Sequence, residues 1–250
     1  MQLKNKIAII TGASSGIGAQ AARLFAKNGA KLVLGARRGD KLEALVDELK
    51  QEGHQAVWLA GDVQDESFNE ALTKLAVSEF GGLDIAFNNA GTMGDMSPLP
   101  DMSADNWHNV IDTNLTSAFF AAKHQIPAMI KRGAGSLIFT SSFVGHTIGF
   151  PGMGAYAAAK AGLIGLVQVL AVENGSQNIR ANALLPGGTK TPMAGDDPQV
   201  HEWVENLHAL KRMAQPIEIA QAALFLASDQ ASFVTGSAMI VDGGNSINKT

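Results

Sequence analysis

The chain of 250 residues is 46% hydrophobic and 17% charged, and it contains no cysteine. This composition suits a buried core and excludes a disordered chain, disulfides and thiolate catalysis. A net charge of −4 disfavours general attraction to nucleic acid or to an anionic membrane, although it allows a local site for a small anion. The length suits a single α/β domain, which we expect to extend over residues 1–250.

Signals for export or membrane insertion are missing from the sequence. The segment "MQLKNKIAIITGASSG" holds an apolar run before Thr11 that is too short for the apolar region of a signal peptide. No uninterrupted stretch of about 18 apolar residues follows. We therefore expect a cytoplasmic protein.

Short apolar runs rich in β-branched residues alternate with longer amphipathic stretches. The runs are nearly continuous, which is typical of strands covered on both faces. Strands are predicted at 6–11, 31–36, 55–60, 83–88, 136–141, 178–185 and 237–242. Helices are predicted at 16–28, 40–52, 65–80, 103–132, 156–174 and 216–227. These repeated units predict an α/β fold, a doubly wound (Rossmann-type) seven-stranded parallel sheet with helices on both faces.

One long irregular segment, "PGGTKTPMAGDDPQV", begins at Pro186. A loop of this length in a compact domain is commonly a binding loop or a lid. We therefore predict a substrate lid over about residues 187–212.

The first predicted strand leads directly into "TGASSGIG", a glycine-rich turn that opens the first helix. Backbone N–H groups in such a turn, together with the positive end of the helix, can bind a phosphate. Glycines at these positions would also suit a tight turn with close helix packing, but the strand–turn–helix context favours a dinucleotide. The cofactor-binding residues predicted here are Gly12, Ser14, Ser15, Gly16, Ile17 and Gly18.

The end of the second strand indicates which dinucleotide is bound. Arg37 and Arg38 stand there, and no carboxylate follows until Asp40, which we expect to cap the next helix. An acidic residue would bond the ribose 2′-hydroxyl of NAD, whereas a guanidinium can bind the 2′-phosphate of NADP. We therefore predict NADP(H) rather than NAD(H). The alternative is that both arginines are solvated loop charges.

Residues after the third and fourth strands extend the predicted cofactor site. Asp62 and Val63 are placed to flank an adenine, with a turn or cap as the alternative role for Asp62. The tetrapeptide "NNAG" follows the fourth strand, beside the crevice of a doubly wound sheet. Asn89, Ala90 and Gly91 would let a flat cofactor lie close to the backbone there, although the tetrapeptide could also be a simple turn.

The only tyrosine of the chain, Tyr156, precedes Lys160 by four residues in "YAAAK". On a helix the two side chains share one face. A phenol has an ordinary pKa of about 10, and a neighbouring ammonium lowers it, so that the phenol can exchange protons near neutral pH. In isolation the pair also fits a partly buried aromatic beside a surface lysine.

Taken together, these motifs resemble those of the short-chain dehydrogenase/reductase family, in its single-domain Rossmann-type branch. The motifs are T-G-x-x-x-G-x-G at 11–18, N-N-A-G at 88–91, Asn114, Ser142, Y-x-x-x-K at 156–160 and P-G-x-x-x-T at 186–191. The ending "VTGSAMIVDGG" is also similar. The resemblance implies hydride transfer between a nicotinamide and a carbonyl carbon.

The resemblance implies a role for each catalytic residue. Tyr156 would protonate the carbonyl oxygen in reduction and deprotonate the alcohol in oxidation. Lys160 would lower the pKa of Tyr156 and bond the nicotinamide ribose. Ser142 would hydrogen-bond the substrate oxygen, and Asn114 would hold a water that links Lys160 to solvent.

Two assignments follow from matching the family's motifs. The resemblance implies Ser142 as the catalytic serine rather than Thr140 or Ser141, because "SFVG" matches the family's S-x-x-G. The residues implied at the nicotinamide, beside Tyr156 and Lys160, are Pro186, Gly187, Thr189 and Thr191.

Segments that would wall the substrate pocket carry large apolar side chains and few charges, which predicts an apolar ketone or secondary alcohol. The predicted pocket residues are Phe143, His146, Phe150, Met153, Met193 and Trp203. As an alternative, several of them would only pack the lid. The histidines show no metal-ligand spacing, so no metal site is predicted.

The leading prediction is an NADP(H)-dependent ketone reductase that also works as an alcohol dehydrogenase. A 3-oxoacyl-[acyl-carrier-protein] reductase is the alternative within the family, for which Lys190, Lys211 and Arg212 could supply a modest basic patch. A nucleotide-binding sensor without turnover is the alternative from another class, but a pure binder would not need the phenol. The resemblance also implies a homotetramer; no nucleic-acid or membrane partner is expected.

Overall fold

The computed structural model describes residues 1–248, and in these residues seven parallel strands form one sheet. The strands are β1 (Ile7–Thr11), β2 (Lys31–Ala36), β3 (Ala56–Ala60), β4 (Ile85–Asn88), β5 (Gly135–Thr140), β6 (Ile179–Pro186) and β7 (Ala238–Val241). Their order across the sheet is β3-β2-β1-β4-β5-β6-β7. The order therefore reverses between β1 and β4, which confirms the predicted doubly wound fold class.

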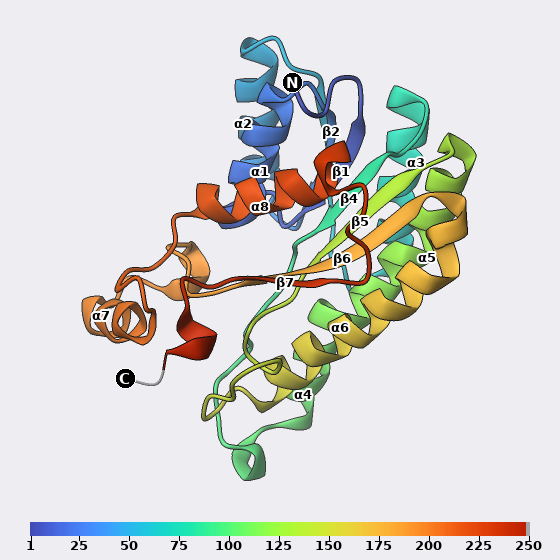
Figure 1. The fold of residues 1–250 in the computed structure, drawn as a ribbon. Helices are drawn as coiled ribbons and strands as arrows, with labels where there is room; N and C mark the ends of the chain where they lie inside the picture. Colours follow the sequence, from blue (N-terminus) through green and yellow to red (C-terminus); the bar gives the residue numbers. More distant parts are fainter. Residues whose placement is uncertain (249–250) are drawn as a thin grey trace.

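Helices cover both faces of this sheet (Figure 1). One face carries α1 (Gly16–Lys27), α2 (Gly39–Gln51) and α8 (Pro216–Ala227). The other face carries α3 (Glu66–Phe80), α5 (Ser117–Arg132) and α6 (Gly154–Asn174), and α4 (Ala104–Ile111) precedes α5. The carboxyl ends of the strands stay uncovered by these helices, and this edge is where a doubly wound sheet holds its ligand.

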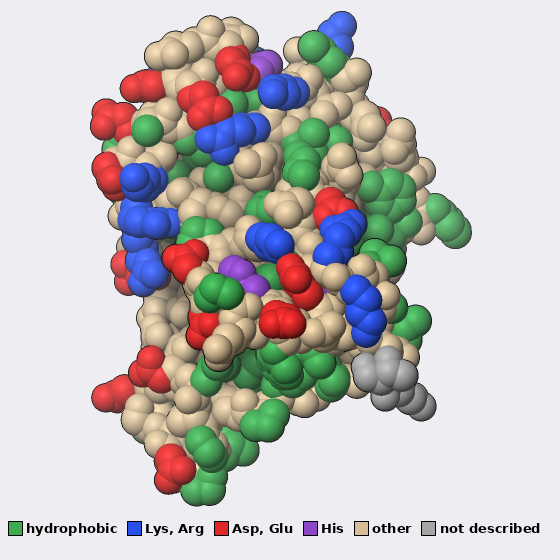
Figure 2. Space-filling view, turned by 90° about the vertical axis from the view of Figure 1, so that its left-hand side faces the viewer, with side chains coloured by type: hydrophobic (Ala, Val, Ile, Leu, Met, Phe, Trp, Pro, Cys, Tyr) green, Lys and Arg blue, Asp and Glu red, His purple; other side chains and the backbone are tan. Residues whose placement is uncertain are grey.

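The helix α7 (Pro198–Leu207) lies inside the predicted lid. The irregular segment that begins at Pro186 was expected to reach Val200, but the helix already begins at Pro198. Asp197 caps the helix by accepting a 2.8 Å hydrogen bond from Gln199 N–H, and Pro198 occupies the first helical position. This Asp–Pro pair is a helix-start signal that could have been read from the sequence. The side of the molecule that carries α7 faces the viewer in Figure 2.

Another local expectation is also wrong, because Asp40 does not cap α2. The helix begins at Gly39 with Arg38 as its N-cap residue, and Asp40 lies in the first turn. A carboxylate in that turn still stabilises the positive end of the helix.

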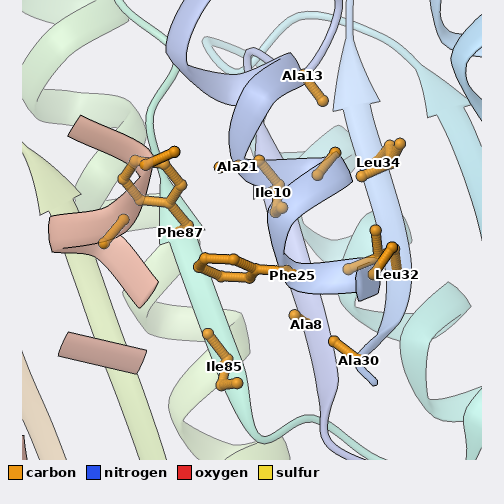
Figure 3. Packing of buried hydrophobic residues seen from close by; sticks show 14 of the residues in the cluster. Ala8, Ile10, Ala13, Ala21, Phe25, Ala30, Leu32, Leu34, Ile85 and Phe87 are labelled. Carbon is orange, nitrogen blue, oxygen red and sulfur yellow. The ribbon is translucent and has the colours of Figure 1, made fainter. Parts of the chain in front are cut away.

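The core on the α1 side is built around aromatic and alanine side chains (Figure 3). The rings of Phe25 on α1 and Phe87 on β4 are stacked with their centroids 6.4 Å apart. Ala21 and Ala22 are fully buried on the same helix, and their small side chains let α1 approach the sheet closely. This packing fixes the start of α1 relative to the carboxyl ends of β1 and β4.

The core on the other face depends on α6, which carries Tyr156 and Lys160. The stretch Gly154–Gln177 is long and apolar enough to cross a membrane by length and composition. In the structure it packs against β6, with Leu163 and Val167 buried in the core. The packing of α6 on the sheet brings Tyr156 and Lys160 to the carboxyl edge of β5.

Candidate active site

A cavity of about 730 Å³ opens at the carboxyl edge of the sheet, a volume typical of small-molecule sites. Its walls come from the turns after β1, β2, β3, β4, β5 and β6 and from α6 and α7. The turn after β1 forms a polar end, and the segments around α7 form an apolar end. Most of the residues predicted for the cofactor and for catalysis line it.

The turn between β1 and α1 forms a cradle for a phosphate group. Gly12 has φ +66° and Gly16 has φ +54°, a left-handed conformation that favours glycine. A Cβ atom on Gly12 would lie 2.9 Å from Asn89 Nδ2, so this turn also needs glycine to pack against the turn after β4. The first turn of α1 holds no acidic residue, which leaves its positive end open to an anion. These features fit the pyrophosphate of a dinucleotide.

Gly18 has a different function from the other two glycines. It does not line the cavity, and a Cβ atom on it would meet the carbonyl oxygen of Gly12. Gly18 therefore allows close packing of α1 against the turn, which is the packing role considered from the sequence.

Arg38, rather than Arg37, is fixed against the glycine-rich turn. Arg38 Nη2 donates hydrogen bonds of 2.9 Å to Ser14 Oγ and 2.7 Å to Ser15 Oγ. The side chain of Arg37 is 77% exposed, and its Nη1 lies 3.8 Å from Asp62 Oδ2. Both arginines line the cavity, but only Arg38 has its guanidinium positioned by hydroxyl groups of the phosphate cradle.

The turn after β4 joins the two ends of the cavity. Asn89 N–H donates a 3.0 Å hydrogen bond to Thr11 Oγ1, which ties this turn to β1. A Cβ atom on Gly91 would lie 2.7 Å from Asn114 Oδ1 and 3.4 Å from Lys160 Nζ. Glycine is therefore required at position 91 for the backbone to approach both polar side chains.

The side chain of Asn114 is fully engaged by backbone groups. It lies in a π-helical turn (Asp112–Thr116) that divides the helix predicted at 103–132 into α4 and α5. Asn114 Nδ2 donates 2.8 Å hydrogen bonds to the carbonyl oxygens of Val110 and Thr92, and Oδ1 accepts a 3.2 Å hydrogen bond from Thr92 N–H. The bond to Val110 occupies a carbonyl of the preceding helical turn, which accounts for the local change in helix type.

Tyr156 and Lys160 both line the cavity. Lys160 is buried, and its Nζ lies 5.6 Å from the centroid of the Tyr156 ring. Burial lowers the pKa of Lys160 to about 7. Burial also raises the pKa of Tyr156, and a hydrogen bond with Ser142 opposes this shift only in part. The net shift of the phenol pKa is therefore upward and is set by burial. The lowering of this pKa by Lys160 stays a prediction.

The three hydroxyl residues at the end of β5 have separate partners. Thr140 Oγ1 donates to Asn89 Oδ1 over 3.2 Å, and Ser141 Oγ donates to the carbonyl oxygen of Lys160 over 2.7 Å. Ser142 lines the cavity and is the one of the three that hydrogen-bonds Tyr156. Ser142, the residue chosen from the sequence motif, is thus the one that contacts the phenol, and its catalytic role stays a prediction.

Aromatic rings connect the lid to the segment after β5. The centroids of Phe143 and Phe150 lie 6.1 Å apart, and those of Phe150 and Trp203 lie 5.8 Å apart, both edge-to-face. His146 is exposed and does not line the cavity, so its predicted place in the pocket is wrong; the backbone turns at Gly145, with φ +87°, and directs it outward. The predicted pocket residues that do line the cavity are Phe143, Phe150, Met153, Met193 and Trp203.

Sequence reasoning missed several lining residues, among them Met93 and Met96 after "NNAG". It also missed Val200, Val204 and Leu207, which recur along α7 at intervals of four and three residues. That apolar stripe is the signal of an amphipathic helix with one face toward a cavity. The prediction of an irregular lid does not include this stripe.

A glycine-rich turn before the first helix and a tyrosine–lysine pair in the same cavity fit a nicotinamide-dependent oxidoreductase of the Rossmann type. Residues 12–246 match a family model described as enoyl-(acyl carrier protein) reductase. The chain belongs to the short-chain dehydrogenase/reductase family, as its motifs predicted. It is an oxidoreductase of the alcohol dehydrogenase type, and the family implies a nicotinamide cofactor.

Individual relatives match over nearly the whole chain. Cyclohexanol dehydrogenase of Acinetobacter sp. (strain SE19) is 38% identical over 97% of this chain and 95% of its own length. A-factor type gamma-butyrolactone 1′-reductase (1S-forming) of Streptomyces virginiae is 39% identical over 98% of this chain and 97% of its own. The crystal structure of a short-chain type dehydrogenase/reductase from Mycobacterium marinum superposes with a TM-score of 0.94 at 34% identity, and the match covers 99% and 98% of the two chains.

Proposed function

We propose that the protein is an NADP(H)-dependent enzyme that reduces uncharged ketones to secondary alcohols, reversibly, with Tyr156 as general acid and base. The observation that carries this proposal is the Tyr156 phenol, hydrogen-bonded to Ser142 and beside Lys160 in a cavity with one apolar end. A binding protein without turnover would have no use for this arrangement.

The chain supplies the proton and the orientation of the substrate. When bound, the nicotinamide supplies or accepts the hydride. Ser142 donates a hydrogen bond to the substrate oxygen, and Tyr156 transfers its phenolic proton to that oxygen during reduction. Lys160, with a pKa of about 7, can hold or release a proton at neutral pH and is suited to restore the phenol. In alcohol oxidation the phenolate accepts the hydroxyl proton.

The preference for NADP(H) is supported by Arg38. Its guanidinium is held over the phosphate cradle by Ser14 and Ser15, where a forked donor can bind a 2′-phosphate. The end of β2 carries no carboxylate that would repel this group, since Asp40 lies within α2. We propose Arg38 as the principal reader of the 2′-phosphate and Arg37 as a secondary one.

An uncharged substrate is supported by the distribution of charge around the cavity. Arg37, Arg38 and Asp62 line its nucleotide end, and Lys160 lies at the proton-transfer centre. The apolar end is lined by aromatic rings and methionines. One relative is named for an uncharged alicyclic alcohol, cyclohexanol dehydrogenase. The name of cis-4-hydroxycyclohexanecarboxylate dehydrogenase of Sinomonas cyclohexanicum, 40% identical over 96% of both chains, supports only the hydroxyl-bearing ring, because that substrate also carries a carboxylate. We propose cyclic ketones such as cyclohexanone as the substrate class.

The alternative of an acyl-carrier-protein substrate is weakened by the side-chain pairing on the lid side. Lys190 Nζ lies 3.0 Å from Glu205 Oε1, and Arg212 Nη2 lies 2.7 Å from Glu218 Oε1. Figure 2 shows acidic and basic side chains interspersed on the side that carries α7. The basic side chains that an acidic carrier protein would need are thus largely neutralised by partners within the chain.

A homotetramer is part of the proposal. Apolar side chains on α5 and α6 remain exposed, including Phe119, Val169 and Val172. Burial of such a surface between subunits would stabilise an oligomer. Sedimentation of the wild type and of Val172→Glu tests this: the proposal requires a tetramer that the substitution weakens, and a monomeric wild type would contradict it.

The test of the function compares the wild type with Tyr156→Phe. We expect the variant to retain NADPH binding and to lose turnover of cyclohexanone by a factor of about 10² or more, because the general acid is removed. Equal turnover in both proteins would overturn the proposed mechanism. A wild type that reduces 3-oxoacyl thioesters but no simple ketone would favour the acyl-carrier alternative.

A further inference from the structure

We infer that His208 is a positioning residue that joins the end of the lid helix α7 to the Gly187–Gly188 wall of the active-site cavity. His208 directly follows α7, and it is 1% exposed. We call this connection between α7 and the Gly187–Gly188 wall the joint, and the contacts of the His208 ring are sufficient to define it. Only its expected effect on the KM for ketone rests on the function proposed above.

Both ring nitrogens of His208 have backbone partners. Nδ1 lies 2.7 Å from the carbonyl oxygen of Val204, which can only accept, so Nδ1 carries the hydrogen. Nε2 accepts a 3.0 Å hydrogen bond from Gly188 N–H, which can only donate. This pair of partners selects the neutral ring with its hydrogen on Nδ1. The ring thereby connects the last turn of α7 to the segment that follows β6.

The surrounding backbone leaves room for the ring only because it consists of glycine. A Cβ atom on Gly187 would lie 2.9 Å from His208 Nε2, and one on Gly188 would lie 2.9 Å from Cε1. A Cβ atom on Gly243 would lie 3.3 Å from Cδ2. Three glycines from two segments thus form the slot for one imidazole.

The Gly187–Gly188 segment is held by the protein on its other side as well. Gly187 N–H donates a 3.0 Å hydrogen bond to the carbonyl oxygen of Val241, and the carbonyl oxygen of Gly188 accepts a 2.9 Å hydrogen bond from Ala214 N–H. Without the imidazole, this segment would keep its attachment to the sheet. It would lose its direct bond to α7, and Gly188 N–H would lose its acceptor.

The joint matters because both of its sides line the cavity. Gly187 and Gly188 belong to the wall at the reactive end, and Val204 and Leu207 of α7 belong to the apolar end. His208 itself is not among the lining residues, so it acts through these walls and does not touch the substrate. Its loss should weaken substrate and dinucleotide binding more than it slows the proton transfer at Tyr156.

The experiment compares His208→Leu, which removes both hydrogen bonds, with His208→Gln, whose side-chain oxygen can still accept from Gly188 N–H. His54→Leu is the control for the loss of a histidine. His54 does not line the cavity, and its ring pairs with Glu52 rather than with α7. We expect His208→Leu to raise the exchange rate of the Gly188 amide hydrogen and the KM for ketone about tenfold, as expected for a lost buried hydrogen bond, while kcat changes little. His208→Gln should restore most of both quantities, and His54→Leu should leave them unchanged.

Amide exchange is measured without cofactor or substrate, so it tests the joint even if Tyr156→Phe disproves the proposed function. Unchanged Gly188 exchange in His208→Leu would overturn the joint, and faster exchange with an unchanged KM would overturn the positioning role. Nitrogen NMR of the wild type gives an independent test should the leucine variant fail to fold. A ring with its hydrogen on Nε2, or a doubly protonated ring at neutral pH, contradicts the inference.

Discussion

Lys160 Nζ donates a 2.6 Å hydrogen bond to the backbone carbonyl oxygen of Thr140, the last residue of β5. Ser141 Oγ in turn donates to the carbonyl oxygen of Lys160. The helix that carries Tyr156 is therefore attached at two points to the strand end that carries Ser142. This attachment sets the relative positions of the phenol, the hydroxyl and the ammonium within the protein itself.

The buried ammonium of Lys160 should reduce stability in a pH-dependent way. Burial lowers the pKa of Lys160 from 10.5 in the unfolded chain to about 7, so the unfolded chain binds more protons between these values. The free energy of unfolding should therefore rise with pH through this window. We expect Lys160→Met to be more stable than the wild type at pH 6, by about 1–3 kcal/mol after the lost hydrogen bond is counted.

Chemical denaturation of both proteins at pH 6 and pH 9 measures this difference, which should shrink at the higher pH. Turnover should be lost in the variant at both values. A variant that is less stable than the wild type at pH 6 would show that the folded protein accommodates the ammonium without a desolvation penalty.

Ser142 should control the ionisation of Tyr156. Its hydrogen bond lowers the phenol pKa against the effect of burial, so Ser142→Ala should raise that pKa further. Alcohol oxidation needs the phenolate, and its pH profile should shift to higher pH while turnover falls by a factor of about 10²–10³. Ser141→Ala is the matched control for the pH shift alone: it removes one attachment of α6 but no bond to the phenol, so its pH profile should stay in place. An unshifted profile in Ser142→Ala would disprove this coupling.

The two arginines after β2 should differ in their effect on cofactor choice. Arg38→Asp should raise the KM for NADPH by a factor of about 10 or more and change that for NADH little, because it removes a charge-assisted contact and adds repulsion. Arg37→Asp should have a smaller effect, since Arg37 is exposed and only loosely paired with Asp62. Steady-state kinetics with both cofactors tests this. If Arg37→Asp raised the KM for NADPH more than Arg38→Asp, Arg37 would be the principal residue that binds the 2′-phosphate.

Trp203 should set the affinity for bulky ketones by closing the apolar end. Its ring packs edge-to-face on Phe150 and is 54% exposed, so its removal should open the lid with little loss of stability. We expect Trp203→Ala to raise the KM for cyclohexanone several-fold, because the lost aromatic contact contributes about 1 kcal/mol to binding. The value of kcat should be nearly unchanged. Trp107→Ala on α4 is the control, because Trp107 does not line the cavity. Equal KM values in the two variants would remove Trp203 from the substrate site.

Prediction of the fold succeeded where the pattern is local. Nearly continuous apolar runs located all seven strands of the sheet within the described residues, with ends displaced by up to two residues, as at Ile85 of β4. The lid helix α7 was missed although Asp197 and Pro198 mark its start. Its apolar stripe faces a cavity rather than the main core. The Gly- and Pro-rich residues that precede the stripe predict a loop, so the pattern is not recognised as a helix.

The sequence by itself determined the features that depend on backbone chemistry and short spacing. The glycines at Gly12 and Gly16 permit left-handed turns, and the four-residue spacing puts Tyr156 and Lys160 on one helical face. These properties follow from steric limits and helical periodicity, which act within a few residues.

Only the tertiary structure decided which partners these groups meet. It brought Ser142 to the phenol, held Arg38 over the phosphate cradle, directed His146 outward and enclosed His208 between α7 and the end of β6. It also buried Tyr156, which raises the pKa of the phenol. Burial and hydrogen-bond partners depend on segments far apart in the chain, and both shift a pKa in ways that local spacing does not contain.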